Sequence, residues 1–159
     1  MIVELSQEEV RVCTLLATER WLTKFDSVDR PNYAKGKAEG RLEHELLANI
    51  RANVSEWAVA RAYSLSWNVP WYPNRLHPLR KNIPDVGEYE VRTIRTATAI
   101  PFWDKDMQKR IYGTKILDDN YYSQVEIYGY FEAGEQLDRA YRDESIGGWR
   151  MPLEYLKND

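Results

Sequence analysis

The residues with the clearest chemical potential lie in the segment PDVGEYEVR, residues 84–92. Glu90 and Arg92 are two positions apart in an alternating stretch, so their side chains leave the same face of an expected strand. Asp85 precedes them across Gly87, which permits a tight turn that brings the two carboxylates together. Two close carboxylates repel each other unless a proton or a divalent cation lies between them. A cation held there beside a basic side chain is what hydrolysis of a phosphodiester bond needs.

Charge is distributed unevenly along the chain. The formal net charge is −3, but residues 69–116 carry nine Lys and Arg against five Asp and Glu. Residues 117–159 carry four against ten, and residues 1–68 are nearly balanced. A basic region that encloses a few carboxylates suits a polyanion held against a divalent cation. Chance variation in the number of charged residues between short segments of any sequence explains the same counts. On charge alone, this is the simpler interpretation.

The composition excludes several classes of protein. A chain of 159 residues with 43% hydrophobic and 13% aromatic residues has the length and apolar content of one folded domain, residues 1–159. It has no apolar run of the roughly 18 residues that a membrane span needs, and no secretory leader pattern at its start. Cys13 is the single cysteine and the two histidines lie far apart, which argues against a disulfide framework or a structural zinc site. We therefore expect a soluble intracellular domain.

The pattern along the chain predicts helices first and strands afterwards. Ser6 and Glu9 form a capping box, so a helix is expected from there to about residue 24. The other expected elements are a helix over 41–65, strands over 88–96, 98–103, 110–117 and 124–131, a short helix over 133–141, and a strand over 149–153. This order indicates an α+β domain in which the N-terminal helices cover a mainly antiparallel mixed sheet.

Two polar, proline-containing stretches, residues 26–40 and 66–84, separate these elements. Within the second stretch, residues 67–81 combine aromatic and basic side chains. Arg75, Arg80 and Lys81 are candidates to hold the phosphates of a nucleic acid. The tryptophans would stack on bases or pack the loop down, and for Trp67, which closes the long helix, packing is the simpler role.

The chain resembles a known group of enzymes in these segments. Pro84-Asp85 followed by Glu90-Val91-Arg92 is similar to the PD-(D/E)XK nuclease signature, with Arg92 at the position of the usual lysine. Over roughly residues 40–155 it resembles small nuclease-like proteins encoded by bacteriophages. The order of short motifs that carries this resemblance is SEWAVARA at 55–62, DVG at 85–87 with VRT at 91–93, DKD at 104–106 and IYGY at 127–130.

The resemblance implies a restriction-endonuclease-like fold whose core spans residues 41–155, after an N-terminal helix and linker over 1–40. It implies a hydrolase that cleaves DNA with Mg²⁺ or Mn²⁺. Asp85 and Glu90 would then be metal ligands, and Arg92 would stabilise the developing charge. Glu56, on the first core helix, would be an additional ligand.

Each of these assignments has an alternative that the residues leave open. Glu56 shares a helical stripe with Asn49, Asn53 and Ala60, which would let a strand edge or a phosphate approach it, but a helical glutamate commonly faces solvent. Arg92 stays protonated and acts only as a donor and a positive charge, or as an ion-pair partner of a neighbouring glutamate. Lys105 is a conceivable replacement for the missing lysine and a further candidate for nucleic-acid contact.

The sequence is therefore compatible with three functions. The first is a metal-dependent DNA nuclease, phage-encoded and active in the cytoplasm of the host cell. The second is a catalytically inactive nuclease-like scaffold that serves as a phage structural or nucleic-acid-binding protein, with a homodimer or a phage assembly partner left open. The third is an inhibitor of host nucleic-acid enzymes that acts through the acidic C-terminal third.

Overall fold

In a computed structural model of the protein, the described residues form an α+β structure of two long helices and two small sheets. The structure describes residues 1–25, 42–69 and 83–158. In chain order the elements are β1 (Ile2–Glu4), α1 (Gln7–Phe25), α2 (Leu42–Ala62), β2 (Tyr89–Ile94), β3 (Ala99–Phe102), β4 (Arg110–Ile116), β5 (Gln124–Glu132), β6 (Tyr141–Asp143) and β7 (Gly148–Pro152). Short 3₁₀ turns lie at Asp104–Asp106, Leu137–Arg139 and Leu153–Tyr155.

The predicted capping box starts α1. Ser6 N–H donates to Glu9 Oε2 (2.8 Å), and Glu9 N–H donates to Ser6 Oγ (3.2 Å). These reciprocal bonds satisfy two donors that the first helical turn leaves without partners. The helix predicted over 41–65 is also confirmed, although it ends at Ala62. No helix in the described ranges is long and apolar enough to cross a membrane.

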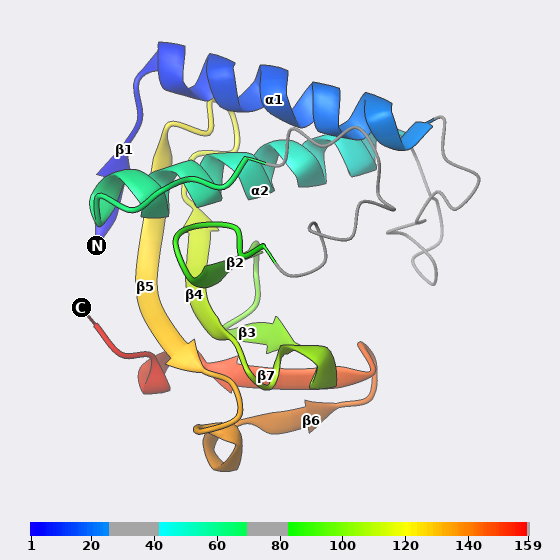
Figure 1. The fold of residues 1–159 in the computed structure, drawn as a ribbon, viewed down its shortest axis with the longest axis vertical. Coiled ribbons are helices and arrows are strands. Elements are labelled where there is room, and N and C mark those ends of the chain that lie inside the picture. Colours follow the sequence, from blue (N-terminus) through cyan, green and yellow to red (C-terminus); the bar gives the residue numbers. More distant parts are fainter. Residues whose placement is uncertain (26–41, 70–82, 159) are drawn as a thin grey trace.

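The first sheet has the order β1-β5-β4-β2, in which β2 runs parallel to β4 and the other pairs are antiparallel. The second sheet has the antiparallel order β3-β7-β6. Figure 1 shows α2 lying between α1 and the first sheet, with the second sheet at the opposite end of the long strands β4 and β5. The expectation of N-terminal helices over a mainly antiparallel sheet is confirmed, and β2 is left as an edge strand.

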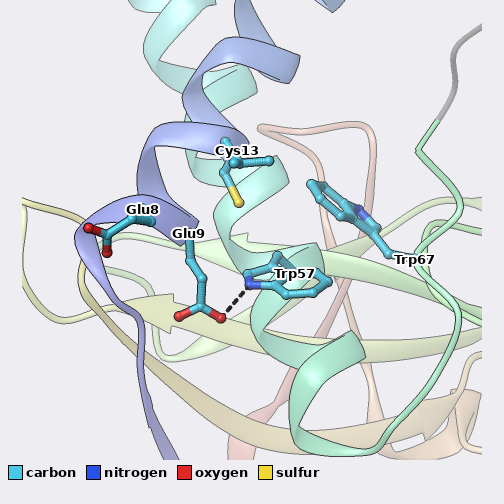
Figure 2. A pocket seen from close by; sticks show the side chains of 6 residues that line it. Glu8, Glu9, Cys13, Trp57 and Trp67 are labelled. Carbon is cyan, nitrogen blue, oxygen red and sulfur yellow. Dashed lines mark hydrogen bonds between the residues drawn. The ribbon is translucent and has the colours of Figure 1, made fainter.

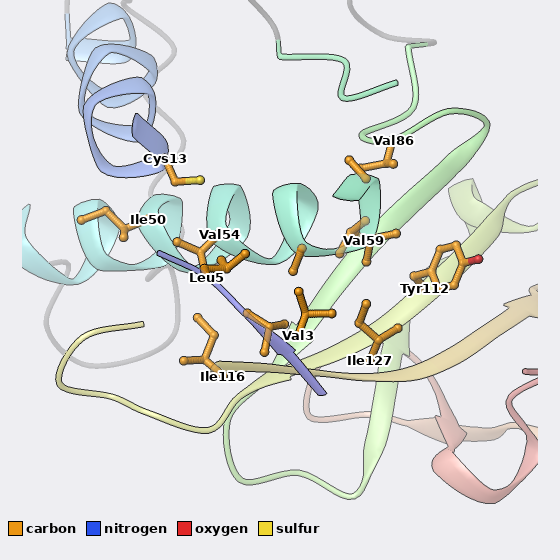
Figure 3. Packing of buried hydrophobic residues seen from close by; sticks show 14 of the residues in the cluster. Val3, Leu5, Cys13, Ile50, Val54, Val59, Val86, Tyr112, Ile116 and Ile127 are labelled. Carbon is orange, nitrogen blue, oxygen red and sulfur yellow. The ribbon is translucent and has the colours of Figure 1, made fainter. Parts of the chain in front are cut away.

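Two apolar clusters stabilise this arrangement, one on each face of the first sheet. The cluster between α1, α2 and the sheet includes Val54, Val59 and Tyr112, each at most 1% exposed (Figure 3). The second cluster joins the first sheet to the second through residues such as Phe102 and Phe131, whose rings meet edge to face at 5.2 Å. The described residues cover both faces of the sheet and leave its two edges, along β1 and β2, without a further paired strand.

Two expectations about the C-terminal part need correction. The short helix predicted over 133–141 is wrong, because the chain forms only a 3₁₀ turn at Leu137–Arg139 and then enters β6. The buried Gln136 side chain accepts from Glu132 N–H and donates to the Tyr155 carbonyl, so this segment is held by side-chain bonds rather than by a helix. The short strands β1 and β6, three residues each, were not predicted.

Candidate functional site

The candidate site lies along the outer edge of β2. Pairing with β4 uses one side of this strand, and no other described strand pairs with the backbone groups on its other side. At Val91 both groups on that side find side-chain partners. Its N–H donates to Asp85 Oδ2 (2.9 Å), and its carbonyl accepts from Arg92 Nη1 (3.2 Å).

A tight turn before β2 brings Asp85 to this edge, as the sequence predicted. Val86 and Tyr89 exchange two backbone hydrogen bonds, of 3.0 and 2.8 Å, and Gly87 between them has φ +54°. That φ is accessible to glycine without strain. The turn is fastened to the end of the preceding segment, because Gly87 N–H donates to the Ser66 carbonyl (2.8 Å) and Asn68 N–H donates to the Asp85 carbonyl (3.0 Å).

The predicted strand faces are confirmed. Tyr89 packs against Tyr112, and Val91 belongs to the cluster beneath α2. Glu90 and Arg92 leave the opposite face together, and Arg92 Nη1 donates to Glu90 Oε2 (3.2 Å).

One cationic nitrogen lies among three oxygens at this edge. Arg92 Nη1 is 3.2 Å from Glu90 Oε2, 3.2 Å from the Val91 carbonyl oxygen and 3.7 Å from Asp85 Oδ2. The structure thus brings Asp85, Glu90 and Arg92 together. It also confirms that Arg92 is an ion-pair partner of Glu90, which was the alternative reading of that residue.

Lys109 and Asp106 complete the group, and the sequence reasoning missed both of them. Lys109 Nζ donates to Glu90 Oε1 (2.8 Å) and lies 3.5 Å from Asp106 Oδ1. Asp106 is fully buried, and its Oδ2 accepts from Trp103 N–H (3.1 Å). The parallel pairing of β2 with β4 explains their position, because it sets Glu90 opposite Ile111 and so brings the residues before β4 alongside Glu90. The available signal was the turn at 104–106, from which Lys105 rather than Lys109 was considered as the replacement lysine.

Glu56 lies near these residues but is bound elsewhere. Its Oε1 is 3.4 Å from Arg20 Nη1 on α1, and its Oε2 accepts from Trp67 Nε1 (3.0 Å). It is 3% exposed, so the reading that it faces solvent is wrong. Its stripe on α2 is covered by α1 rather than open to a phosphate, since Asn53 donates to the Cys13 carbonyl and accepts from Arg20.

Electrostatic effects connect the three carboxylates. Burial, followed by the negative charges of Glu56 and Glu90, raises the pKa of Asp85 to about 7. The Val91 N–H and the Arg92 guanidinium oppose this rise without cancelling it. Burial lowers the pKa of Lys109, but the hydrogen bond and charge of Glu90 and the charge of Asp106 outweigh burial and raise it. Lys109 is therefore a protonated donor in this arrangement.

The predicted nucleic-acid contacts are described only in part. Arg75, Arg80 and Lys81 lie outside the described residues. Lys105 is exposed, and its Nζ lies 5.8 Å from the centre of the Trp103 ring. It is on the same short turn as Asp106, but Asp106 points inward to Arg92 while Lys105 remains at the surface.

A small apolar cavity adjoins the site behind Trp67. Its volume is about 200 Å³, and Figure 2 shows Cys13 on α1 with the indoles of Trp57 and Trp67 in its wall. Glu9, at the cavity rim, accepts from Trp57 Nε1 (3.0 Å). Burial, with the charges of Glu56 and Glu9, raises the pKa of Cys13 to about 12, so its thiol remains protonated. Trp67 lines the cavity and also donates to Glu56, so it connects the cavity with the carboxylates of the site.

The fit of a divalent cation can be judged from the donors present. Among the described residues, no group of three or more His, Cys, Asp or Glu side chains is placed to hold a metal ion. Two carboxylates and one backbone carbonyl do surround a positive charge, the Nη1 nitrogen of Arg92. Hard oxygen donors of this kind suit Mg²⁺ and Mn²⁺. The chemistry of the oxygens at β2 therefore suits such an ion, and in this structure the arginine nitrogen lies among them, whereas both oxygens of Glu56 have protein partners.

No family model, no curated protein and no solved structure matches this chain.

Proposed function

We propose that this chain is a divalent-metal-dependent phosphodiesterase that cleaves DNA, built on a restriction-endonuclease-like arrangement. The observation that carries the proposal is the position of Arg92 Nη1 among oxygens of Asp85, Glu90 and Val91 at the outer edge of β2. These oxygens would hold Mg²⁺ or Mn²⁺. A metal ion bound there supplies a Lewis acid for the phosphoryl oxygen and lowers the pKa of a bound water.

Two basic residues of the chain would then stabilise negative charge on the phosphate. Arg92 and Lys109 flank Glu90 on two sides, and both carry a positive charge in this arrangement. A fixed positive charge beside the scissile phosphate stabilises the charge that develops in the transition state. Lys109 thus provides the lysine that the signature has at the position of Arg92, although it comes from the residues before β4.

Glu56 is proposed as a supporting residue rather than a direct metal ligand. Arg20 and Trp67 hold its carboxylate, which faces α1. Its negative charge still acts on Asp85, where it contributes to the raised pKa. The negative charges of Glu56 and Glu90 beside Asp85 favour a cation at the sheet edge.

The second candidate is a nuclease-like scaffold without catalysis, and one observation favours it. Arg92 already neutralises the oxygens that a metal ion would need. If its guanidinium is the permanent counter-ion, the site is an internal salt-bridge network, and the protein binds nucleic acid or a phage component without cleaving it.

A cleavage assay distinguishes the two functions. End-labelled single- and double-stranded DNA is incubated with the wild type, with Asp85→Asn and with Asp119→Asn, in Mg²⁺, in Mn²⁺ or in EDTA. Asp119 lies on an exposed turn, so its variant controls for the loss of one charge. We expect cleavage only with metal, retention in Asp119→Asn, and a loss of about 100-fold or more in Asp85→Asn. Absence of cleavage by the wild type with either metal favours the scaffold, and cleavage in EDTA contradicts the proposed chemistry.

A further inference from the structure

The guanidinium of Arg92 reaches two separate sets of acceptors. Its Nη1 lies among the oxygens of Asp85, Glu90 and Val91, and its Nη2 is 3.6 Å from Asp106 Oδ1. The first set is at the outer edge of β2. Asp106 is fully buried, so the guanidinium connects the edge to the interior.

Asp106 has unused capacity to accept a hydrogen bond. Its Oδ2 is held by Trp103 N–H, whereas its Oδ1 is buried and accepts no hydrogen bond from any described residue. The nearest positive groups, Arg92 Nη2 and Lys109 Nζ, remain at ion-pair distances of 3.6 and 3.5 Å. A buried carboxylate oxygen without a hydrogen bond is costly. A small movement of the guanidinium toward Asp106 would supply the missing donor.

We propose that Arg92 is a displaceable internal cation and that Asp106 is the carboxylate that receives its guanidinium when a divalent ion enters the site. This inference rests on the proposed metal-dependent function. A divalent ion and Nη1 cannot share the same three oxygens, because the two positive charges would be in contact. The guanidinium leaves the oxygens, keeps an ion pair by closing on Asp106, and remains beside the site. Metal binding is therefore an exchange of cations, and Asp106 is a positioning residue for Arg92.

Calorimetric titration of Mn²⁺ and of Mg²⁺ tests the exchange without any measurement of activity. The variants are Arg92→Met, Asp106→Asn and the double variant, with Arg95→Met as the control. Arg95 is exposed just beyond the end of β2, so its replacement removes the same charge without touching the oxygens. We expect Arg92→Met to bind metal about tenfold more tightly than Arg95→Met, because the charged hydrogen bonds of Nη1 no longer compete.

The Asp106 variant tests the receiving role. With Arg92 present, Asp106→Asn should weaken metal binding about tenfold, because the displaced guanidinium loses its acceptor. In the Arg92→Met background the same replacement should change the affinity much less. An equal loss in both backgrounds overturns the receiving role, because it indicates a general effect of the Asp106 charge. If Asp106→Asn does not fold, NMR of the arginine side chains in the wild type replaces it. The signal that disappears in Arg92→Met must then shift on addition of Mg²⁺, and an unchanged signal overturns the inference.

Failure of this inference and failure of the proposed function give different results. Equal affinities of the wild type, Arg92→Met and Arg95→Met overturn the exchange but leave the metal site in place. Metal binding by Arg92→Met alone indicates that Arg92 occupies the oxygens and is not displaced, which overturns both the exchange and metal-dependent activity in the natural protein. Absence of binding in every variant, Arg92→Met included, overturns both.

Discussion

Replacement of Asp85 by asparagine tests the electrostatics of the site most directly. Asparagine has nearly the same shape and retains an oxygen that can accept the Val91 N–H, so the change removes mainly the negative charge. That charge lies near those of Glu56 and Glu90, and the Val91 N–H and the Arg92 guanidinium offset their effect on its pKa only in part. The protonated form of Asp85 is therefore favoured more in the folded protein than in the unfolded chain.

The sign and size of the effect follow from the pKa. Asp85 titrates at about 7 in the folded state and near its ordinary 3.8 when unfolded. Between these values the folded state binds more protons, so the free energy of unfolding falls as the pH rises from about 4 to 7. At 1.36 kcal/mol for each pKa unit, the full penalty above pH 7 is about 4 kcal/mol. Because a fifth of the side chain is exposed and solvent screens part of the repulsion, we expect about 2 kcal/mol.

Urea denaturation followed by tryptophan fluorescence, in buffer without divalent ions, measures this effect. Asp85→Asn should be more stable than the wild type by about 2 kcal/mol at pH 8, and the difference should shrink steadily toward pH 5. Asp119→Asn, which removes one charge from an exposed turn, should show no such trend. If Asp85→Asn is equal to or less stable than the wild type at pH 8, the charge of Asp85 is compensated and the reasoning is refuted.

Three further replacements test other contacts. Lys109→Met should lower kcat/KM for DNA cleavage by about 100-fold in a steady-state assay, because the donor on Glu90 is lost; an unchanged value would exclude Lys109 from the chemistry. Trp67→Phe should reduce the free energy of unfolding by about 1–3 kcal/mol in urea, because the buried Glu56 carboxylate loses a hydrogen bond. Gly129→Ala should lower the unfolding midpoint far more than Gly147→Ala, since both glycines have positive φ but only at Gly129 would a Cβ lie 2.2 Å from a backbone oxygen. Equal shifts of the unfolding midpoint in the two glycine variants would show that the positive φ alone, and not the contact with the backbone oxygen, causes the loss of stability.

The local pattern of residues was sufficient for most of the elements. The capping box at Ser6 located the start of α1, and alternation located the strands at 89–94, 99–102, 110–116 and 124–132 to within two residues. The turn at Gly87 and the shared face of Glu90 and Arg92 were also predicted correctly. These features depend on interactions within a few residues of the chain, and for that reason a single sequence reveals them.

Local pattern failed where a distant segment decided the outcome. β5 alternates in burial throughout, yet Ile127 packs under α2 whereas Phe131 packs against the second sheet. The pairing of β5 with β4 is irregular next to Gly129, whose φ is +122°. This irregularity changes the face to which the alternating side chains point, so Ile127 and Phe131 lie on opposite faces of the sheet. The backbone of Lys157, which bonds to Tyr130, lies against Gly129. No spacing within the strand itself indicates this contact.

The same division holds at the candidate site. The sequence by itself determined that Asp85, Glu90 and Arg92 meet, because one turn and one strand place them. Only the tertiary structure decided which lysine joins them, since the parallel pairing of β2 with β4 brings Lys109 to Glu90. The partner of Glu56 was likewise decided by tertiary structure, because the packing of α1 on α2 places Arg20 beside its carboxylate. Helical spacing specifies which side chains share a face, but the element that covers that face is fixed by contacts between residues far apart in the chain.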